Sequence, residues 1–179
     1  MKHEDIIFAG FGGQGVLFAG QLLSYAGMAE NLHVTWIPSY GPEMRGGTAN
    51  CTVILSEEEI GAPIVRYPTI AVIFNIPSME KYEPVVKPGG LLLVNSSLVE
   101  TDSEREDIRP LYIPASDIAT ELGNPRMANM VMLGALIGAT NLVSLETVAQ
   151  QLDEHLSQRQ RKWLEPNIKA LKKGVELGK

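Results

Sequence analysis

Short apolar runs alternate with longer amphipathic stretches along the chain, and most of the runs are rich in β-branched residues. Glycine, proline or serine bounds each run, so the runs are predicted to be buried strands and the stretches between them helices. Strands are expected near residues 5–9, 33–38, 48–55, 69–75, 90–95 and 110–113. Helices are expected near residues 14–30, 78–86, 116–122, 126–140, 144–155 and 158–176. This alternation predicts an α/β fold with a Rossmann-like, doubly wound and mostly parallel sheet.

One connection departs from the parallel pattern. Only SYGPEMRGG joins the strands expected at 33–38 and 48–55, whereas a parallel crossover needs about a dozen residues or more. We therefore expect these two strands to run antiparallel, with the strand near 48–55 toward an edge of the sheet. That strand alternates apolar with polar side chains, as a half-buried strand does: Ala49, Cys51, Val53 and Leu55 against Thr48, Asn50 and Thr52.

Composition narrows the class of protein. A chain of 179 residues with 45% hydrophobic content suits one domain over residues 1–179. The net charge of -6 and the lack of a long basic block argue against a nucleic-acid partner. The start of the chain has no signal-peptide pattern, and the longest apolar run, 130–139, is too short to cross a bilayer. We therefore expect a cytoplasmic protein with no membrane partner.

The metal-binding and redox residue types are sparse. Cys51 is the single cysteine, so the chain can form neither an internal disulfide nor a cysteine-ligated iron–sulfur cluster. Its place on the apolar face of a strand favours a buried, inert side chain over a reactive thiol. His3, His33 and His155 are scattered and have no other ligand type at suitable spacing, so no metal site is predicted.

The segment GFGGQG lies between the first expected strand and the first expected helix. Gly10, Gly12 and Gly15 match G-x-G-x-x-G, a turn in which N–H groups at a helix start can attract an anion. The same glycines are also explained by a sharp turn into a packed helix alone. NAD binding needs an acidic residue at the end of the second strand, where the sequence reads TWIPSYGP. Val16 and Leu17 exclude a P-loop, so neither nucleotide motif is complete.

The loop SYGPEMRGG carries more chemistry than a turn requires. Arg45 could clamp a phosphate or carboxylate and Glu43 could orient it, although the two side chains could instead pair and brace the loop. The carboxyl ends of parallel strands lie at the same edge of a sheet. We therefore expect this loop, the glycine turn, Asn75 and Asn95 to lie together at that edge. The loop and the glycine turn are expected to leave adjacent strands. The candidate ligand-binding residues are Gly10, Gly12, Gly13, Gln14, Gly15, Ser39, Tyr40, Glu43, Arg45, Gly46, Gly47, Asn75 and Asn95.

Four segments taken together resemble a known family. GFGGQGV, SYGPEMRGGTANCTVILS, PGGLLLVNSS and IPASDIATELGNPRMANMVMLGAL are similar to the gamma subunit of the 2-oxoacid:ferredoxin oxidoreductases. The resemblance covers about residues 4–140, and GxGGQG followed by GPExRGG is far more specific than either motif alone. It implies a gamma-type catalytic domain of the pyruvate/ketoisovalerate oxidoreductase type.

The resemblance also implies a division of labour. The complex oxidatively decarboxylates a 2-oxoacid to acyl-CoA, an activity of the EC 1.2.7 type, and passes electrons to ferredoxin. Thiamine diphosphate, magnesium and iron–sulfur clusters are expected in partner alpha, beta and ferredoxin-like delta subunits. This chain would bind none of them alone, pack on the thiamine-binding core and help to admit coenzyme A, the substrate. Its surface for partners is expected to make the isolated chain self-associate.

Other readings remain open at this stage. The chain could be a free-standing nucleotide-binding module, or a scaffold subunit that touches no substrate. Branched-chain 2-oxoacids and 2-oxoglutarate are favoured over pyruvate because the gamma chain is small and separate.

Three features near the C-terminus also have two explanations each. Gly134 and Gly138 favour close helix packing over a membrane dimer signal. Asn124, Arg126 and Asn129 belong to the resembled pattern, or simply cap a helix. Trp163, in a basic helix interrupted at Pro166, is expected to be solvated, with partner docking as the alternative.

Overall fold

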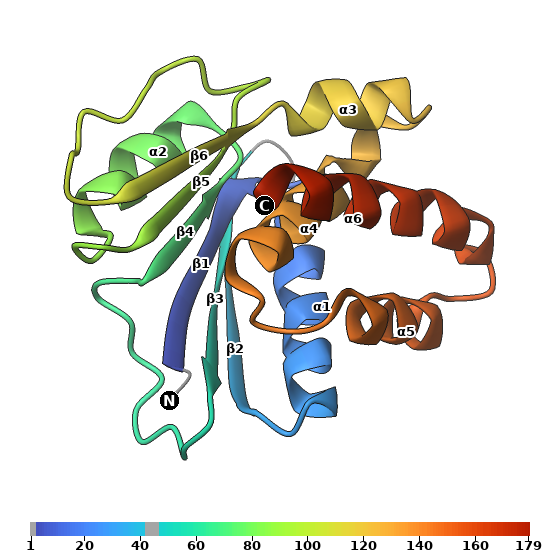
Figure 1. The fold of residues 1–179 in the computed structure, drawn as a ribbon, viewed down its shortest axis with the longest axis horizontal. Coiled ribbons are helices and arrows are strands. Elements are labelled where there is room, and N and C mark those ends of the chain that lie inside the picture. Colours follow the sequence, from blue (N-terminus) through green and yellow to red (C-terminus); the bar gives the residue numbers. More distant parts are fainter. Residues whose placement is uncertain (1–2, 42–46) are drawn as a thin grey trace.

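The protein has an α/β fold, in which helices flank a sheet of parallel and antiparallel strands (Figure 1). This is the predicted fold class. The computed structural model describes residues 3–41 and 47–179. Its six strands lie in the order β2-β3-β1-β4-β5-β6. Their bounds are β1 His3–Phe11, β2 His33–Tyr40, β3 Thr48–Ser56, β4 Ile70–Ile73, β5 Leu91–Asn95 and β6 Arg109–Ile113.

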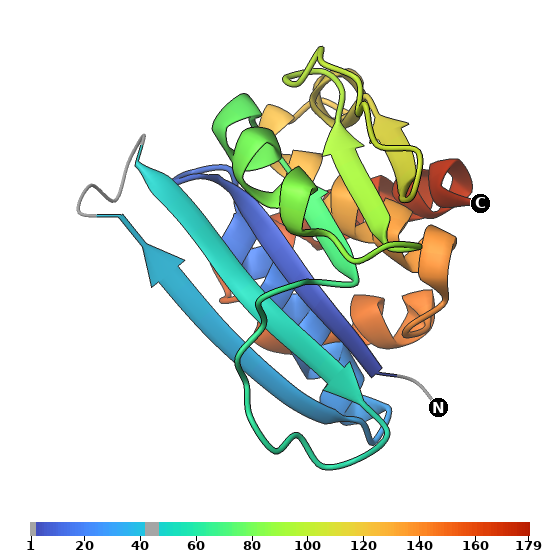
Figure 2. The ribbon, with the colours of Figure 1, turned by 90° about the vertical axis from the view of Figure 1, so that its left-hand side faces the viewer.

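Most of the helices cover one face of the sheet, and α2 covers the other over β4 and β5 (Figures 1 and 2). The helices are α1 Val16–Ala29, α2 Ile76–Tyr82, α3 Ala115–Glu121, α4 Ala128–Thr140, α5 Leu145–His155 and α6 Leu164–Gly178. Short 3-10 turns are η1 Glu83–Val85, η2 Pro125–Met127 and η3 Arg161–Trp163. No helix in the described ranges is both long and apolar enough to span a membrane.

The expected antiparallel pairing is confirmed, but the predicted neighbours were partly wrong. β3 runs antiparallel to both β2 and β1, with Tyr40 opposite Ala49 and Phe11 opposite Thr48. β2 is therefore the edge strand, and β3 separates it from β1. The glycine turn and the segment between β2 and β3 follow strands that are parallel but not adjacent, because β3 lies between β1 and β2.

Two predicted helices differ from the structure near prolines. The helix expected at 78–86 begins at Ile76, because the Asn75 side chain accepts a hydrogen bond from Ser78 N–H and caps it. That helix ends at Tyr82, and η1 with Pro84 follows. The C-terminal helix begins at Leu164, so Pro166 lies in its first turn, where a missing N–H costs no helical bond.

The main core lies between the sheet and α1, α3, α4, α5 and α6, and a smaller one lies under α2. Cys51 is fully buried in the main core, as predicted from the strand alternation. Burial raises the pKa of its thiol to about 12, against a smaller lowering effect of Trp36. The thiol therefore stays protonated and unreactive at neutral pH.

Glycines bring α4 and α6 into backbone contact. A Cβ atom at Gly134 would lie 2.1 Å from the Leu171 carbonyl oxygen, and one at Gly174 would lie 2.0 Å from the Val131 carbonyl oxygen. Gly138 and Gly178 make equally close approaches to the opposite helix. The structural interpretation of Gly134 and Gly138 is confirmed, and α6 is the helix they accommodate.

We predict that Gly174→Ala destabilises the protein by about 2 kcal/mol or more, because the new methyl group would meet rigid backbone. The higher helix propensity of alanine, worth about 1 kcal/mol, would offset only part of this. Gly61→Ala is the matched control, since nothing lies within 4 Å of a Cβ there. Urea unfolding of both variants measures the difference, and equal midpoints would contradict the close packing.

Candidate ligand site at the glycine turn

The turn between β1 and α1 requires glycine at two positions. Gly13 has φ +102° and Gly15 has φ +73°, both in the left-handed region that favours glycine. Gly15 is also the N-cap of α1, and no side chain of the described residues caps the first turn of this helix. Helix-start N–H groups are therefore left for water or a ligand.

Gln14 fastens the turn from inside. Its Oε1 accepts from Phe11 N–H at 2.6 Å, and its Nε2 donates to the Phe74 carbonyl at 3.3 Å. The side chain thus ties the end of β1 to the end of β4. With both ends of its amide engaged, Gln14 holds the turn rather than projecting into solvent.

Two further contacts tie the turn to the rest of the fold. Gly12 N–H donates to the Gly47 carbonyl at 2.9 Å, which joins the turn to the residue just before β3. Asn129 Nδ2, at the start of α4, donates to the Gly15 carbonyl at 3.1 Å. A Cβ atom on Gly15 would lie 2.4 Å from that nitrogen, so the contact also excludes a side chain at position 15.

A pocket of about 360 Å³, here called the turn pocket, opens beside the start of α1. The pocket brings together predicted residues of the turn with the strand-ending Tyr40, which is 58% exposed. Its lining residues are Phe11, Gly12, Gly13, Gly15, Val16, Leu17, Phe18, Tyr40, Thr48 and Ala49. None of these lining residues has a charged side chain. Within the described ranges, the partial positive charge at the pocket therefore comes from the N–H groups at the start of α1.

Other predicted residues lie elsewhere. Gly10 is buried at the end of β1, and Ser39 is opposite Asn50, on the face of the sheet away from α1. Gly47 contributes its carbonyl to the tie with Gly12. Glu43, Arg45 and Gly46 lie outside the described residues.

Asn75 and Asn95 are buried helix caps rather than open rim groups. Asn75 is 4% exposed and caps α2, and its Nδ2 has no partner among the described residues. Asn95 is fully buried, its Nδ2 donating to Ser116 Oγ at 2.9 Å and its Oδ1 accepting from Ala115 N–H at 3.2 Å. It thereby holds the start of α3 against β5.

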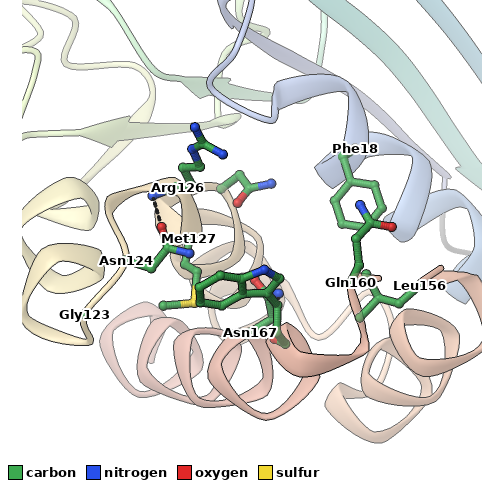
Figure 3. Close-up of a pocket in the computed structure, with 10 residues that line it drawn as sticks. Phe18, Gly123, Asn124, Arg126, Met127, Leu156, Gln160 and Asn167 are labelled. Carbon is green, nitrogen blue, oxygen red and sulfur yellow. Dashed lines mark hydrogen bonds between the residues drawn. The ribbon is translucent and has the colours of Figure 1, made fainter. Parts of the chain in front are cut away.

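Two more pockets border the turn and were missed by sequence reasoning. One of about 200 Å³ is lined by Gly13, Gln14, Asn95 and Arg126, among others. The other, of about 550 Å³, lies between the starts of α4 and α6 and includes Phe18, Arg126 and Trp163 (Figure 3). Arg126 and Trp163 lie far apart in the sequence, so their proximity could not be predicted. The motif GNPRMANM, which contains Arg126, was the one sequence feature that pointed to this region.

The groups at these pockets suit the binding of a ligand. The described residues contain no group of three histidine, cysteine, aspartate or glutamate side chains that could hold a metal ion. Glycine N–H donors, aromatic walls and a nearby arginine suit an anionic ligand with an apolar part. The fold and site therefore define an α/β protein with a glycine turn between its first strand and first helix, bordered by a pocket.

Comparison with known proteins identifies the family. Residues 5–177 match the pyruvate ferredoxin/flavodoxin oxidoreductase family, and the chain belongs to it. The chain is 38% identical to the 2-oxoglutarate synthase subunit KorC of Methanocaldococcus jannaschii, over 99% of this chain and 95% of that one. The family resemblance carried by the four motifs is thus confirmed.

Two further relatives are longer proteins. The ketoisovalerate oxidoreductase subunit VorA of Methanothermobacter marburgensis is 41% identical over 79% of this chain, and the match spans 30% of VorA. A solved structure of 2-oxoglutarate:ferredoxin oxidoreductase from Magnetococcus marinus, with 2-oxoglutarate, coenzyme A and succinyl-CoA bound, superposes with a TM-score of 0.91 at 28% identity. That match covers 99% of this chain and 31% of the other. The chain thus spans about a third of these two relatives.

We predict that Asn95→Ala lowers the free energy of unfolding by about 1–3 kcal/mol, because it removes buried hydrogen bonds to α3. Ser97→Ala is the control: Ser97 accepts from Asp117 N–H at 3.1 Å on the same helix but in an exposed setting, so its loss should cost less than about 1 kcal/mol. Chemical denaturation separates the two. An Asn95→Ala variant as stable as its parent would restore Asn95 to the list of free rim groups.

Proposed function

We propose that this chain is the gamma-type subunit of a 2-oxoacid:ferredoxin oxidoreductase, which converts a 2-oxoacid to acyl-CoA and passes electrons to ferredoxin. The family match along residues 5–177 carries this proposal. KorC and VorA are named for 2-oxoglutarate and ketoisovalerate, which supports 2-oxoglutarate or a branched-chain 2-oxoacid as the substrate. Thiamine diphosphate and iron–sulfur clusters, which supply the decarboxylation and electron transfer, would belong to partner subunits. This chain has one cysteine, and that cysteine is buried.

The role of this chain in the complex would be to bind coenzyme A at the turn pocket. An anionic group of coenzyme A would lie against the free N–H groups at the start of α1, and the apolar walls would flank its pantetheine arm. Arg45, which follows Tyr40 by five residues, is the cation that the sequence offers for a phosphate. The coenzyme A in the Magnetococcus marinus structure makes this ligand chemically reasonable for a relative.

NAD is the less suitable ligand for this turn. In a dinucleotide-binding fold, the acidic residue that holds the ribose ends a strand next to the first one. Here β3 lies between β1 and β2, which separates those strands by roughly 10 Å at normal strand spacing. β2 also ends in Ser39 and Tyr40, without a carboxylate. Calorimetric titration with NAD, NADP and coenzyme A distinguishes the two ligands.

We predict that the purified chain alone is colourless, catalytically inert and self-associating. Exposed Ile64 (76%) and Tyr67 (61%) offer apolar surface that partners would cover. Absorption spectroscopy, 2-oxoacid oxidation assays and sedimentation at high concentration test the three statements. Visible absorbance from a stoichiometric iron–sulfur centre would contradict the assignment of the clusters to partner subunits. A strict monomer would contradict the self-association.

We predict that Arg45→Ala in the assembled complex raises the apparent KM for coenzyme A about tenfold or more, the effect of losing about 1.5–3 kcal/mol of charge-assisted bonding. Arg45→Lys should fall between, because it keeps the charge but loses the bidentate fork. The half-reaction of the 2-oxoacid with thiamine diphosphate should be nearly unchanged.

Arg66→Ala is the control for Arg45→Ala, because Arg66 is an exposed cation in the loop after β3, at the opposite end of the sheet. An unchanged KM for coenzyme A in a correctly assembled Arg45→Ala complex would contradict the coenzyme A site. Arg45 would then stabilise its own loop instead of binding a ligand. The chain would then act as a scaffold subunit.

A further inference from the structure

The 550 Å³ pocket between the starts of α4 and α6, here called the Trp163 pocket, has features that the proposed coenzyme A site does not use. Four segments that are far apart in the sequence form it: α1, the η2–α4 junction, the end of α5 and the η3–α6 junction. Figure 3 shows Arg126 and Phe18 on opposite sides of the pocket, with Asn167 below both in this view. The pocket is therefore a product of the tertiary fold.

The pocket has apolar walls that are large enough to seat one side chain. Phe18, Met127, Leu156 and Trp163 supply these walls. Trp163 lines the pocket and remains 39% exposed. A half-exposed tryptophan beside a preformed hollow is the usual form of an interface anchor, since a partner side chain can complete its burial.

Cationic side chains border the pocket, although the net charge of the whole chain is -6. No carboxylate is among the lining residues that the structure describes, and the Arg126 guanidinium pairs with no described residue. Lys162 Nζ lies 5.3 Å from the centre of the Trp163 ring, and Arg159 is exposed beside the pocket residue Gln160.

Acidic side chains also lie close to the pocket in the sequence, among them Asp153 and Glu165. Arg161 is paired with Asp153 at 2.8 Å, so that cation is already balanced. Glu165 is exposed in the first turn of α6, three residues after Lys162. Arg126 and Lys162 have no ion-pair partner among the described residues. A partner that matches this surface must be acidic and must carry an apolar side chain.

We infer that the Trp163 pocket docks an acidic segment of another subunit of the complex, which inserts an aromatic or long aliphatic side chain between Phe18 and Trp163. Carboxylates flanking that side chain would face Arg126 and Lys162. The inference rests on the proposed function, because it requires the chain to work in a complex. Phe18 also lines the turn pocket, so the docked segment would lie directly beside the glycine turn.

Site-specific cross-linking in the complex tests which molecule occupies the pocket. The chain, with a photoreactive amino acid in place of Gln160, is co-expressed with its companion oxidoreductase subunits. The complex is then irradiated, and mass spectrometry identifies the linked peptide. A second preparation carries the photoreactive group at Glu146, an exposed position at the far end of α5. We expect Gln160 to link to a segment of another subunit that is rich in carboxylates, and Glu146 not to link there. A link to a second copy of this chain, or no link, overturns the inference.

Affinity measurements test the energetic part of the inference. Trp163→Ala and Lys162→Glu should each weaken binding of the purified chain to the subcomplex that lacks it by about tenfold or more. Lys162→Glu should also reduce the salt dependence of the association rate. Lys172→Glu, which reverses an exposed charge elsewhere on α6, is the control and should bind like the unaltered chain. Thermal melts that match the parent would show that the variants are folded.

The outcomes separate this inference from the proposed function. If the unaltered chain does not associate with oxidoreductase subunits at all, the proposed function falls and the inference falls with it. If it associates and both pocket variants bind with unchanged affinity, only the docking inference is overturned.

Discussion

The hydrogen bond from Asn129 to the Gly15 carbonyl places the start of α4 against the start of α1, and the arrangement of the pockets depends on it. The bond is possible because Gly15 lacks a side chain and adopts a left-handed conformation. Gln14 ties the same turn to β4, and Gly12 ties it to the residue before β3. A short loop thus joins several elements, and its free N–H groups are held in place before any ligand arrives. Such preorganisation lowers the entropy cost of binding.

The close packing of α4 and α6 extends this arrangement to the C-terminal segment. Because Gly134 and Gly174 let the two backbones touch, α6 runs alongside α4, and its first residues lie near the start of α4. The result is that Trp163 lines the same pocket as Arg126. The residues after position 144, which looked like generic helix in the sequence, therefore contribute a wall of the 550 Å³ pocket near the turn.

Local patterns were sufficient to predict much of the fold. Alternation in 48–55 and the shortness of the SYGPEMRGG loop gave the antiparallel pair, because both depend only on nearby residues. The insertion of β3 between β1 and β2 could not be predicted, since it depends on how distant strands pair. The cap at Asn75 had a local signal, an asparagine shortly before a proline, that was not used. Asn95 had none, because it caps a helix 20 residues further on.

The candidate site shows the same division. Gly13, Gly15 and Tyr40 were predicted from motifs and do border one pocket, because they lie at or just after the carboxyl ends of the parallel strands β1 and β2. The aromatic wall formed by Phe18 was missed, since a phenylalanine on a helix normally signals core packing.

Phe18 links the two pockets physically. It lines the turn pocket on one side and the Trp163 pocket on the other, and it is only partly buried. Each occupant would restrict its rotamers, and the second to bind would find a side chain that is already ordered. When both occupants select the same Phe18 rotamer, a ligand at the glycine turn and a partner segment at Trp163 would favour each other's binding, and by linkage the effect must be equal in both directions. One partly buried aromatic ring thus gives a route by which assembly of a complex and binding at the turn could be coupled, without a change in the backbone.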